Sequence, residues 1–397
     1  MNNKGCSWLS HGLFLTPSTV GNTVGVKSCC RFSDIMPFTN EKYSGLEDLL
    51  EAKKNPNWNY EYLKDNSCNN CYQEEQISDS SMRTKTLKID SAVPENKIAL
   101  LQISFSNFCN LKCKYCQPTL STEWNNEAVY LKDLYDKGLT TLDQKYLREV
   151  KSTPAQTFEY EKNVIELLKT QDLSYIKQVG IFGGEPFMAR HFEEFVELLS
   201  KQTKPENVEL QINTNATIFP KQKVLDLLKL FGKVDLRCSV EATGELAEYI
   251  RNGLQWNTFE KNVEQWVNFS KTNQNIKVRI HATHTVWSIN KAQNFIDWLE
   301  QKGYLDTVVN SFSYEPTYTD IRKVLSDQQL DQLHVQLDSL SNTKMKKHLQ
   351  SIVSDRSQQQ YHQLALAQFR EFTRVFDPRT PHTLQQVNPE LWHWTHR

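Results

Sequence analysis

The sequence has little of what marks membrane-spanning, secreted or nucleic-acid-binding proteins. Within its 397 residues, no apolar run approaches the roughly 18 residues that would span a bilayer. The N-terminus lacks a charged segment followed by an apolar core, so no secretory signal is predicted. The 46 Lys and Arg nearly balance the 47 Asp and Glu, which gives no overall attraction to nucleic acid or anionic lipid. We therefore expect a cytoplasmic protein with neither nucleic acid nor membrane as a partner.

Common nucleotide-binding and hydrolase motifs are absent as well. The chain has no G-x-x-x-x-G-K-[ST] loop, no nucleophile elbow and no internal repeats. It does have nine cysteines, an odd number that a disulfide framework explains poorly in a reducing compartment. Eight of the nine lie before residue 120. Metal ligands or buried residues are the better explanation, and the positions of the cysteines become the main question.

Three cysteines form a short motif of the type CxxxCxxC. Cys109, Cys113 and Cys116 lie in the segment LLQISFSNFCNLKCKYCQP. Three thiolates on one loop can hold three corners of a 4Fe-4S cluster and leave the fourth iron open. A structural zinc site would need a fourth protein ligand, and no other Cys or His lies within 20 residues of the motif. The spacing favours an iron-sulfur site, with zinc or inert cysteines as the alternatives.

The segment CNLKCKYC, with Tyr115 before its last cysteine, resembles the signature of radical S-adenosylmethionine (radical SAM) enzymes. The resemblance implies that SAM binds the open iron through its amino and carboxylate groups. It also implies cleavage of SAM by the reduced cluster to a 5′-deoxyadenosyl radical, which removes a hydrogen atom from substrate. The fold that it implies is a partial (β/α)6 TIM-type barrel.

Alternating strand and helix patterns follow the cysteine motif, as such a fold requires. Helix-period apolar positions separate successive strand-like runs, which favours a parallel α/β sheet with ligand chemistry at the carboxyl ends of its strands. The predicted strands are Ile98–Ser106, Ile176–Phe182, Val208–Asn213, Val234–Val240, Ile276–Thr283 and Leu305–Phe312. The long interval 117–175 predicts an insertion with extra helices, which is either a lid over the site or a helical spacer.

The second strand is followed by Gly183, Gly184, Glu185 and Pro186. Taken alone, two glycines at a strand end indicate an ordinary turn. In radical SAM enzymes a GGEP-like segment at this distance from the cysteines pairs with the amino group of SAM. The resemblance therefore places these four residues in the cofactor site.

Three later segments also resemble family motifs. Thr214 and Asn215 belong to a TNA segment that is similar to the TNG segment of the peptide-modifying branch, with Ala216 in place of Gly. Ser239 and Glu241 lie in a segment similar to S-x-D/E-G, whose short polar side chains can hydrogen-bond to SAM.

The downstream segment YIRNG matches a YIR-x-G motif, in which Arg251 suits a bidentate contact to the SAM carboxylate. A surface arginine is the alternative. His281, Thr283 and His284 surround the end of the fifth strand, where we expect packed or solvated residues. Cys238 is predicted to be inert core.

The remaining cysteines precede the barrel, and their spacing leaves zinc and an iron-sulfur cluster both open. Their order, with a hairpin-like segment and then CxxC, resembles the twitch or SPASM-type module that holds auxiliary 4Fe-4S clusters. Two departures are that the usual Pro-x-Gly turn is missing and that the module precedes the barrel. We predict Cys6, Cys29, Cys68 and Cys71 as ligands, with Cys30 as the alternative to Cys29.

The predicted organisation is a cysteine-rich module at 1–95, a radical SAM partial barrel at 96–316 and a helical extension at 317–397. The predicted function is hydrogen abstraction from a peptide or protein side chain. An auxiliary cluster would accept an electron, and flavodoxin or ferredoxin would supply one for SAM cleavage. The alternatives are dehydrogenation of a small polar molecule and a non-catalytic, zinc-stabilised binding protein.

Overall fold

The computed structural model describes residues 6–17, 24–29, 36–37, 45–52, 68, 71–72, 75, 81–86, 93–94, 96–142, 154–313 and 316–396. Cys30, the predicted alternative ligand, lies outside these residues. No helix in the described ranges is both long enough and apolar enough to cross a membrane.

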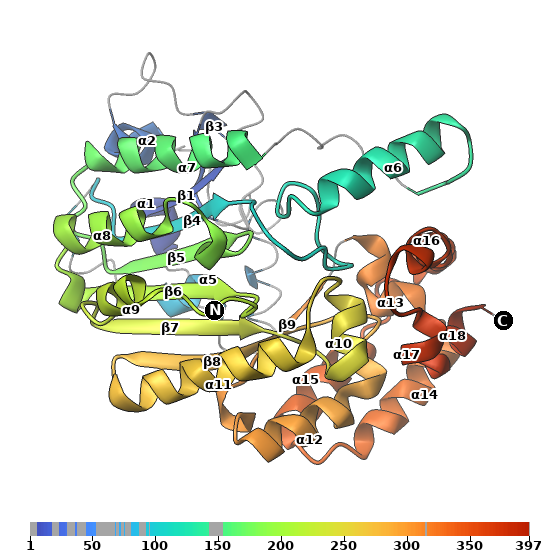
Figure 1. Cartoon of the computed structure of the whole chain (residues 1–397). Coiled ribbons are helices and arrows are strands. Elements are labelled where there is room, and N and C mark those ends of the chain that lie inside the picture. Colours follow the sequence, from blue (N-terminus) through green and yellow to red (C-terminus); the bar gives the residue numbers. More distant parts are fainter. Residues whose placement is uncertain are drawn as a thin grey trace.

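A mostly parallel sheet forms the centre of the molecule (Figure 1). Six of its strands follow one another in chain order and all run parallel. These are β4 (Leu100–Ser106), β5 (Gln178–Gly183), β6 (Glu209–Thr214), β7 (Lys233–Ser239), β8 (Ile276–His284) and β9 (Val309–Phe312). A doubly wound sheet would reverse its order at a switch point, whereas this order is that of a β/α barrel. The first five predicted strands are confirmed, with small shifts at their ends. The sixth is shorter than predicted and covers only Val309–Phe312, because Leu305–Thr307 forms a 3-10 turn.

Side chains alternate across the sheet, as the strand period requires. On β6, Leu210 and Ile212 are fully buried, while Gln211 and Asn213 are partly exposed on the other face. The apolar face packs against the connecting helices, so the polar face is the inner, concave one. The connecting helices are α7 (Pro154–Lys169), α8 (Phe192–Gln202), α9 (Gln222–Leu228), α10 (Gly244–Ile250), α11 (Trp256–Thr272) and α12 (Ala292–Lys302).

The N-terminal segment continues the same sheet. Strand β1 (Gly12–Pro17) pairs in parallel with β4, and Gly12 lies opposite Leu100. It also forms the expected hairpin with β2 (Val24–Lys27), which is followed by the short β3 (Met36–Pro37). The pairing of β1 with β4 was not predicted, and it joins the N-terminal cysteine segment directly to the barrel.

The interval after the cysteine motif contains α6 (Trp124–Asp136) and α7, and residues 143–153 within it lie outside the described part. The C-terminal helix α16 (His362–Phe376) holds the segment that follows α6. Thr140 Oγ1 donates to Glu371 at 2.7 Å, and Arg374 donates to the carbonyl of Leu139 at 2.8 Å.

Residues 316–396 are largely helical and pack beside the end of the barrel (Figure 1). Leu330, Leu333 and Leu337 are buried along one face of α14, as their spacing predicts. The other helices are α13 (Ile321–Val324), α14 (Asp327–Asp338), α15 (Thr343–Val353), α17 (Leu384–Val387) and α18 (Pro389–His396).

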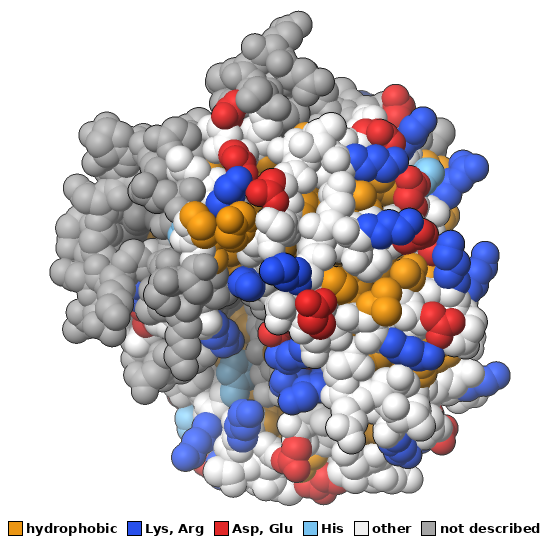
Figure 2. Space-filling view, turned by 90° about the vertical axis from the view of Figure 1, so that its left-hand side faces the viewer, with side chains coloured by type: hydrophobic (Ala, Val, Ile, Leu, Met, Phe, Trp, Pro, Cys, Tyr) orange, Lys and Arg blue, Asp and Glu red, His pale blue; other side chains and the backbone are white. Residues whose placement is uncertain are grey.

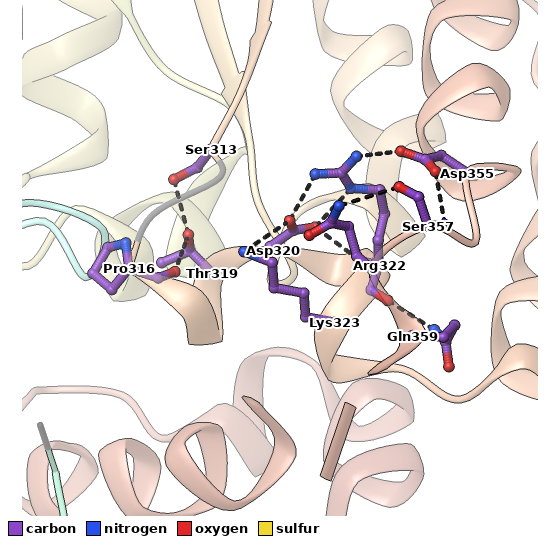
Figure 3. A network of polar contacts seen from close by, with 10 residues as sticks. Ser313, Pro316, Thr319, Asp320, Arg322, Lys323, Asp355, Ser357 and Gln359 are labelled. Atoms are coloured by element: carbon purple, nitrogen blue, oxygen red, sulfur yellow. Dashed lines mark hydrogen bonds and ion pairs between the residues drawn. The ribbon is translucent and has the colours of Figure 1, made fainter. Parts of the chain in front are cut away.

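A buried carboxylate begins this helical region. Asp320 accepts the backbone N–H of Arg322 at 3.0 Å, and so caps α13. It also pairs with the Arg322 guanidinium at 2.8 Å, and Arg322 contacts Asp355 in turn (Figure 3). This network links the start of the helical region to the end of α15.

Candidate active site

The predicted cluster ligands lie together on the loop that follows β4. Cys109 and Cys113 are buried, and Cys116 is partly buried. Burial raises the pKa of Cys109 to about 11 and that of Cys116 to about 12, and the pKa of Cys113 is well above its usual value. The neighbouring thiols add to the increase for Cys113. Because thiolates are disfavoured here without a counter-charge, this donor set suits a cationic metal group.

Hydrogen bonds from residues after the cysteines fix the shape of the loop. Trp124 Nε1 donates to the carbonyl of Cys113 at 3.0 Å, and Ser121 Oγ donates to the carbonyl of Leu111 at 2.5 Å. The sulfur of Cys109 lies 3.5 Å from the backbone nitrogen of Leu111. Such N–H donors at sulfur are one of the means by which proteins tune iron-sulfur clusters.

The two glycines of the GGEP segment are needed for close packing against this loop. A Cβ at Gly183, whose φ is +111°, would lie 2.2 Å from the carbonyl oxygen of Ser106. A Cβ at Gly184 would lie 2.4 Å from the carbonyl oxygen of Phe108. Backbone hydrogen bonds from Gly184 to Ser106 and from Glu185 to Phe108 join the two segments. The glycines thus bring the end of β5 onto the start of the cysteine loop.

Glu185 connects the carboxyl ends of β5 and β6 by hydrogen bonds. Its carboxylate accepts hydrogen bonds from Thr214 Oγ1 at 2.8 Å and from the Asn215 backbone at 2.6 Å. Burial raises the pKa of Glu185 to about 7, and these hydrogen bonds oppose the increase. The Asn215 amide nitrogen lies 3.7 Å from Cys109 Sγ. The structure therefore brings these three predicted site residues to the first cysteine. Pro186 begins the 3-10 turn that follows (Pro186–Met188).

Tyr115, Glu241 and Arg251 form a second polar group beside the cysteines. Arg251 donates to Glu241 Oε2 at 2.7 and 3.2 Å, and Tyr115 Oη donates to the same oxygen at 3.3 Å. Arg251 is only 4% exposed, so the alternative of a surface arginine is wrong. Burial raises the pKa of Glu241, and Arg251 opposes this. Ser239 lies two residues before Glu241, at the end of β7.

One atom of this group has unused hydrogen-bonding capacity. Glu241 Oε1 is buried and has no hydrogen-bond partner among the described residues. An unpaired buried carboxylate oxygen is costly unless a ligand supplies a donor. The three thiols and this oxygen together fit a site for a metal cluster and a polar ligand at the carboxyl ends of parallel strands.

The four described N-terminal cysteines also lie near one another. The pKa of Cys6 is raised to about 12, mainly by burial and in part by the neighbouring Cys29, Cys68 and Cys71. Cys29 packs against Leu100 at the start of β4, whereas Cys109 follows the end of that strand. By the rise of about 3.3 Å per residue, the two cysteine groups are separated by about 20 Å along the strand.

Among the described residues, neither cysteine group surrounds a position for a single metal ion. Within the described ranges, no three His, Cys, Asp or Glu side chains are close enough to hold a single metal ion.

Arg83 is buried near the N-terminal cysteines. Burial raises the pKa of Cys68, and the charge of Arg83 partly opposes this increase. Glu75 accepts a hydrogen bond from Arg83 Nε at 3.0 Å.

The inner face of the sheet carries charged groups that were not predicted. Asp235 Oδ2 accepts from Arg237 at 2.7 and 3.0 Å, and Arg279 Nε lies 2.7 Å from Asp235 Oδ1. Asn213 Oδ1 is buried and has no hydrogen-bond partner in the described part of the chain. The signal for these residues was the polar side chain at every second position of β7 and β8.

Figure 2 views the molecule from the side where β5 to β8 begin. This face is hollowed beside the undescribed residues, with a His side chain in the hollow and Lys and Arg side chains near it.

His281 on β8 lies 3.1 Å from Ser311 Oγ, which also contacts Thr283, while His284 contacts Asn310. His284 is buried, and His281 and Thr283 are partly buried, which agrees with the expectation of packed or solvated residues. Cys238 is fully buried core.

Comparisons with known proteins agree with this site. Residues 103–286 match the model of the radical SAM superfamily. GTP 3′,8-cyclase from Helicobacter pylori is 26% identical over 145 residues, which are 36% of this chain. The match spans about a third, 35%, of that curated relative.

Solved structures are similar to this chain at lower sequence identity and with low TM-scores. The structure of anSMEcpe with bound AdoMet is 18% identical with a TM-score of 0.36, and the overlap covers 55% of this chain and 52% of that one. Streptococcus suis SuiB bound to S-adenosylmethionine is 15% identical with a TM-score of 0.37, over 82% of this chain and 68% of that one. The cysteine loop, the strand order and the family match thus agree, and residues 103–286 of this chain match the radical SAM superfamily.

Proposed function

We propose that Cys109, Cys113 and Cys116 hold the 4Fe-4S cluster of a radical SAM enzyme that modifies a peptide or protein side chain. Membership in the superfamily implies an enzyme with a 4Fe-4S cluster and SAM. When bound, these supply a 5′-deoxyadenosyl radical that takes a hydrogen atom from the substrate. The observation that carries the proposal is the gathering of three thiols, two buried and one partly buried, on one loop at the carboxyl ends of parallel strands.

The chain's own residues would bind and orient SAM. Glu241 Oε1 is a buried acceptor that suits a hydroxyl or amino donor of SAM. Arg251 already donates two hydrogen bonds to Glu241, so a SAM carboxylate would share its guanidinium with that residue. Glu185 would hold Thr214 and Asn215 in place at the neighbouring strand end.

The proposed auxiliary 4Fe-4S cluster lies on Cys6, Cys29, Cys68 and Cys71, at the opposite end of β4. Support comes from the gathering of these four cysteines and from the buried cation of Arg83 beside them. A substrate on the inner face of the sheet would lie between the two cysteine groups. This arrangement suits transfer of one electron from the substrate to the auxiliary site. Zinc remains the alternative occupant.

The substrate class has one rival. The Thr214–Ala216 segment resembles the TNG segment of the peptide-modifying branch, which favours a peptide. Arg237 and Arg279 share the single carboxylate of Asp235, so this group has excess positive charge on the inner face. That excess favours a small anionic molecule, as does the partial likeness to a GTP 3′,8-cyclase.

Iron analysis and SAM cleavage test the cluster assignment. After anaerobic reconstitution, the wild-type chain should bind about eight irons, four for each cluster. With dithionite in place of flavodoxin or ferredoxin, it should form 5′-deoxyadenosine from SAM. Cys113→Ala should abolish this product, while Cys238→Ala, which changes a buried core thiol, should retain it. Product formation by Cys113→Ala would contradict the assignment.

The auxiliary site is tested separately. A Cys68→Ala, Cys71→Ala double variant should bind about four irons and still cleave SAM in the absence of substrate. If the wild-type chain itself binds only three or four irons, the second cluster is wrong. Zinc found at one equivalent per chain in that case would identify the alternative occupant.

A further inference from the structure

The cysteine loop contains a buried lysine, Lys114, that contacts the C-terminal helical region. The loop is paired to the end of α10 and the segment after it by two backbone hydrogen bonds, from Lys114 to Ile250 at 2.8 Å and from Lys112 to Asn252 at 2.9 Å. Lys114 lies between Cys113 and Tyr115, and its side chain is 2% exposed. The environment of this buried lysine therefore bears on the conformation of the loop.

Lys114 is buried among aromatic rings and one carboxylate. Its Nζ lies 3.9 Å from the ring centroid of Tyr249 and 5.6 Å from that of Phe372. It has no hydrogen-bond partner among the described residues, and its ion pair is with Asp377 Oδ1 at 3.6 Å. A buried ammonium group is expensive without a counter-charge, so Asp377 is what makes the position of this lysine tolerable.

Asp377 joins three parts of the chain. It begins the short turn after α16 (Asp377–Arg379) and is 7% exposed. Besides Lys114, it accepts a hydrogen bond from Tyr249 Oη at 2.8 Å and one from the backbone of Leu384 at 2.7 Å. Tyr249 precedes Arg251 by two residues, so one carboxylate connects the cysteine loop to the arginine segment.

A second contact two residues later strengthens this connection. Arg379 donates to Glu127 Oε2 at 2.6 Å, and Glu127 Oε1 pairs with Lys112. Trp124, which donates to the Cys113 carbonyl, packs against Phe376 with ring centroids 5.3 Å apart. Both lysines of the cysteine loop are thus paired through residues at the end of α16.

We propose that Asp377 is a positioning residue of the SAM-cleaving site, which holds Lys114 and Tyr249 so that the cysteine loop and Arg251 keep their relative placement. The inference rests on the proposed function. Asp377 is not proposed as a metal ligand. It acts through the loop backbone on either side of Cys113 and through the segment that carries Arg251.

The test compares Asp377→Asn with Asp320→Asn in the reconstituted protein. Asp320 is a matched control because it is also a buried aspartate that begins a C-terminal turn and pairs with Arg322 and Lys323 (Figure 3). Both changes remove a buried carboxylate that pairs with a buried cation, and Arg322 keeps its contact with Asp355. Only Asp377→Asn should lower formation of 5′-deoxyadenosine, by about 10-fold or more, as loss of supporting contacts at metal sites typically does.

Spectroscopy distinguishes positioning from a loss of stability. In Asp377→Asn, the change in the electron paramagnetic resonance spectrum on addition of SAM should be altered or lost. In Asp320→Asn it should match the wild type. If both variants give the same spectra and the same rate of SAM cleavage, the inference is wrong.

A double variant isolates the role of the ion pair. Lys114→Met removes the cation with little change in volume, so Asp377→Asn combined with Lys114→Met should recover SAM cleavage relative to Asp377→Asn alone. If Asp377→Asn does not fold, the double variant is used in its place to test the inference. A double variant that remains insoluble or inactive would contradict the inference. Failure of the wild-type chain to bind iron and cleave SAM would instead overturn the proposed function.

Discussion

Ala216 has a backbone conformation that glycine adopts without strain. Its φ is +54°, and it occupies the position where the resembling motif has Gly. A left-handed conformation costs a residue with a Cβ about 1–2 kcal/mol. Replacement by Gly would relieve this cost but would lose a buried methyl group and increase the entropy of the unfolded chain, at roughly 0.8 and 0.5–1 kcal/mol.

These contributions nearly cancel, so Ala216→Gly should change the free energy of unfolding by less than about 0.5 kcal/mol. Ala247→Gly is the matched control, because Ala247 is equally buried but lies within α10. There the same change should destabilise the protein by about 1.5 kcal/mol. Urea unfolding of both variants measures the difference. Equal destabilisation would show that Ala216 is not strained.

The sequence predicted site residues that lie in short motifs, but it did not predict side-chain contacts between distant parts of the chain. The cysteine loop, the GGEP segment, Glu241 and Arg251 were predicted because each lies in a short local motif. The link between Lys114 and Asp377 joins residues far apart in the chain, and neither belongs to a motif that sets the pairing. Such a contact is decided by how helices pack, which local periodicity does not specify.

At the scale of elements, local patterns predicted the strands and helices from β4 onward because apolar positions alternate with period 2 or 3.6. The pairing of β1 with β4 was missed. The run GLFLTP is short, and its partner follows only after about 80 residues of chain. The sequence could therefore predict a hairpin, but the extension of the barrel sheet by that hairpin depends on a non-local contact.

A buried histidine at the contact between β8 and α15 predicts that the protein loses stability in acid. His284 is fully buried on β8, its ring lies 6.0 Å from that of His348, and burial lowers its pKa to about 4. In the unfolded chain His284 titrates near 6.5, so its neutral form stabilises the fold above that pH. This contribution is lost as the pH falls from about 6.5 toward 4, and amounts to about 2 kcal/mol between pH 7 and pH 5.

His284→Gln should keep a donor for Asn310 and reduce the acid-induced loss by that amount. His393→Gln, which replaces an exposed histidine on α18, is the control substitution. Unfolding by urea at pH 7 and pH 5 is measured for the wild type and both variants. If wild type and His284→Gln lose equal stability between these pH values, His284 is not held neutral by the fold.

At the scale of the whole molecule, the predicted boundary at residue 317 divides one continuous core. Trp287, which follows β8 and is fully buried, packs against Phe369 and Phe372 of α16, with ring centroids 5.9 and 6.0 Å apart. The backbone of Val286 donates to the carbonyl of Thr319 at 2.9 Å. The helical extension therefore covers apolar side chains of the barrel, in addition to contacting the cysteine loop.

Removal of residues 317–397 should expose this apolar surface and leave an insoluble chain, because large contiguous apolar patches promote association. The full chain and the shortened chain can be compared by soluble yield and by size-exclusion chromatography. Trp287→Ala in the full chain is an independent check, and should cost about 3–5 kcal/mol of unfolding free energy by opening a cavity in the shared core. A soluble fragment 1–316 with a cooperative unfolding transition would instead establish residue 317 as a true domain boundary, and the extension would then be a separately folded addition to the barrel.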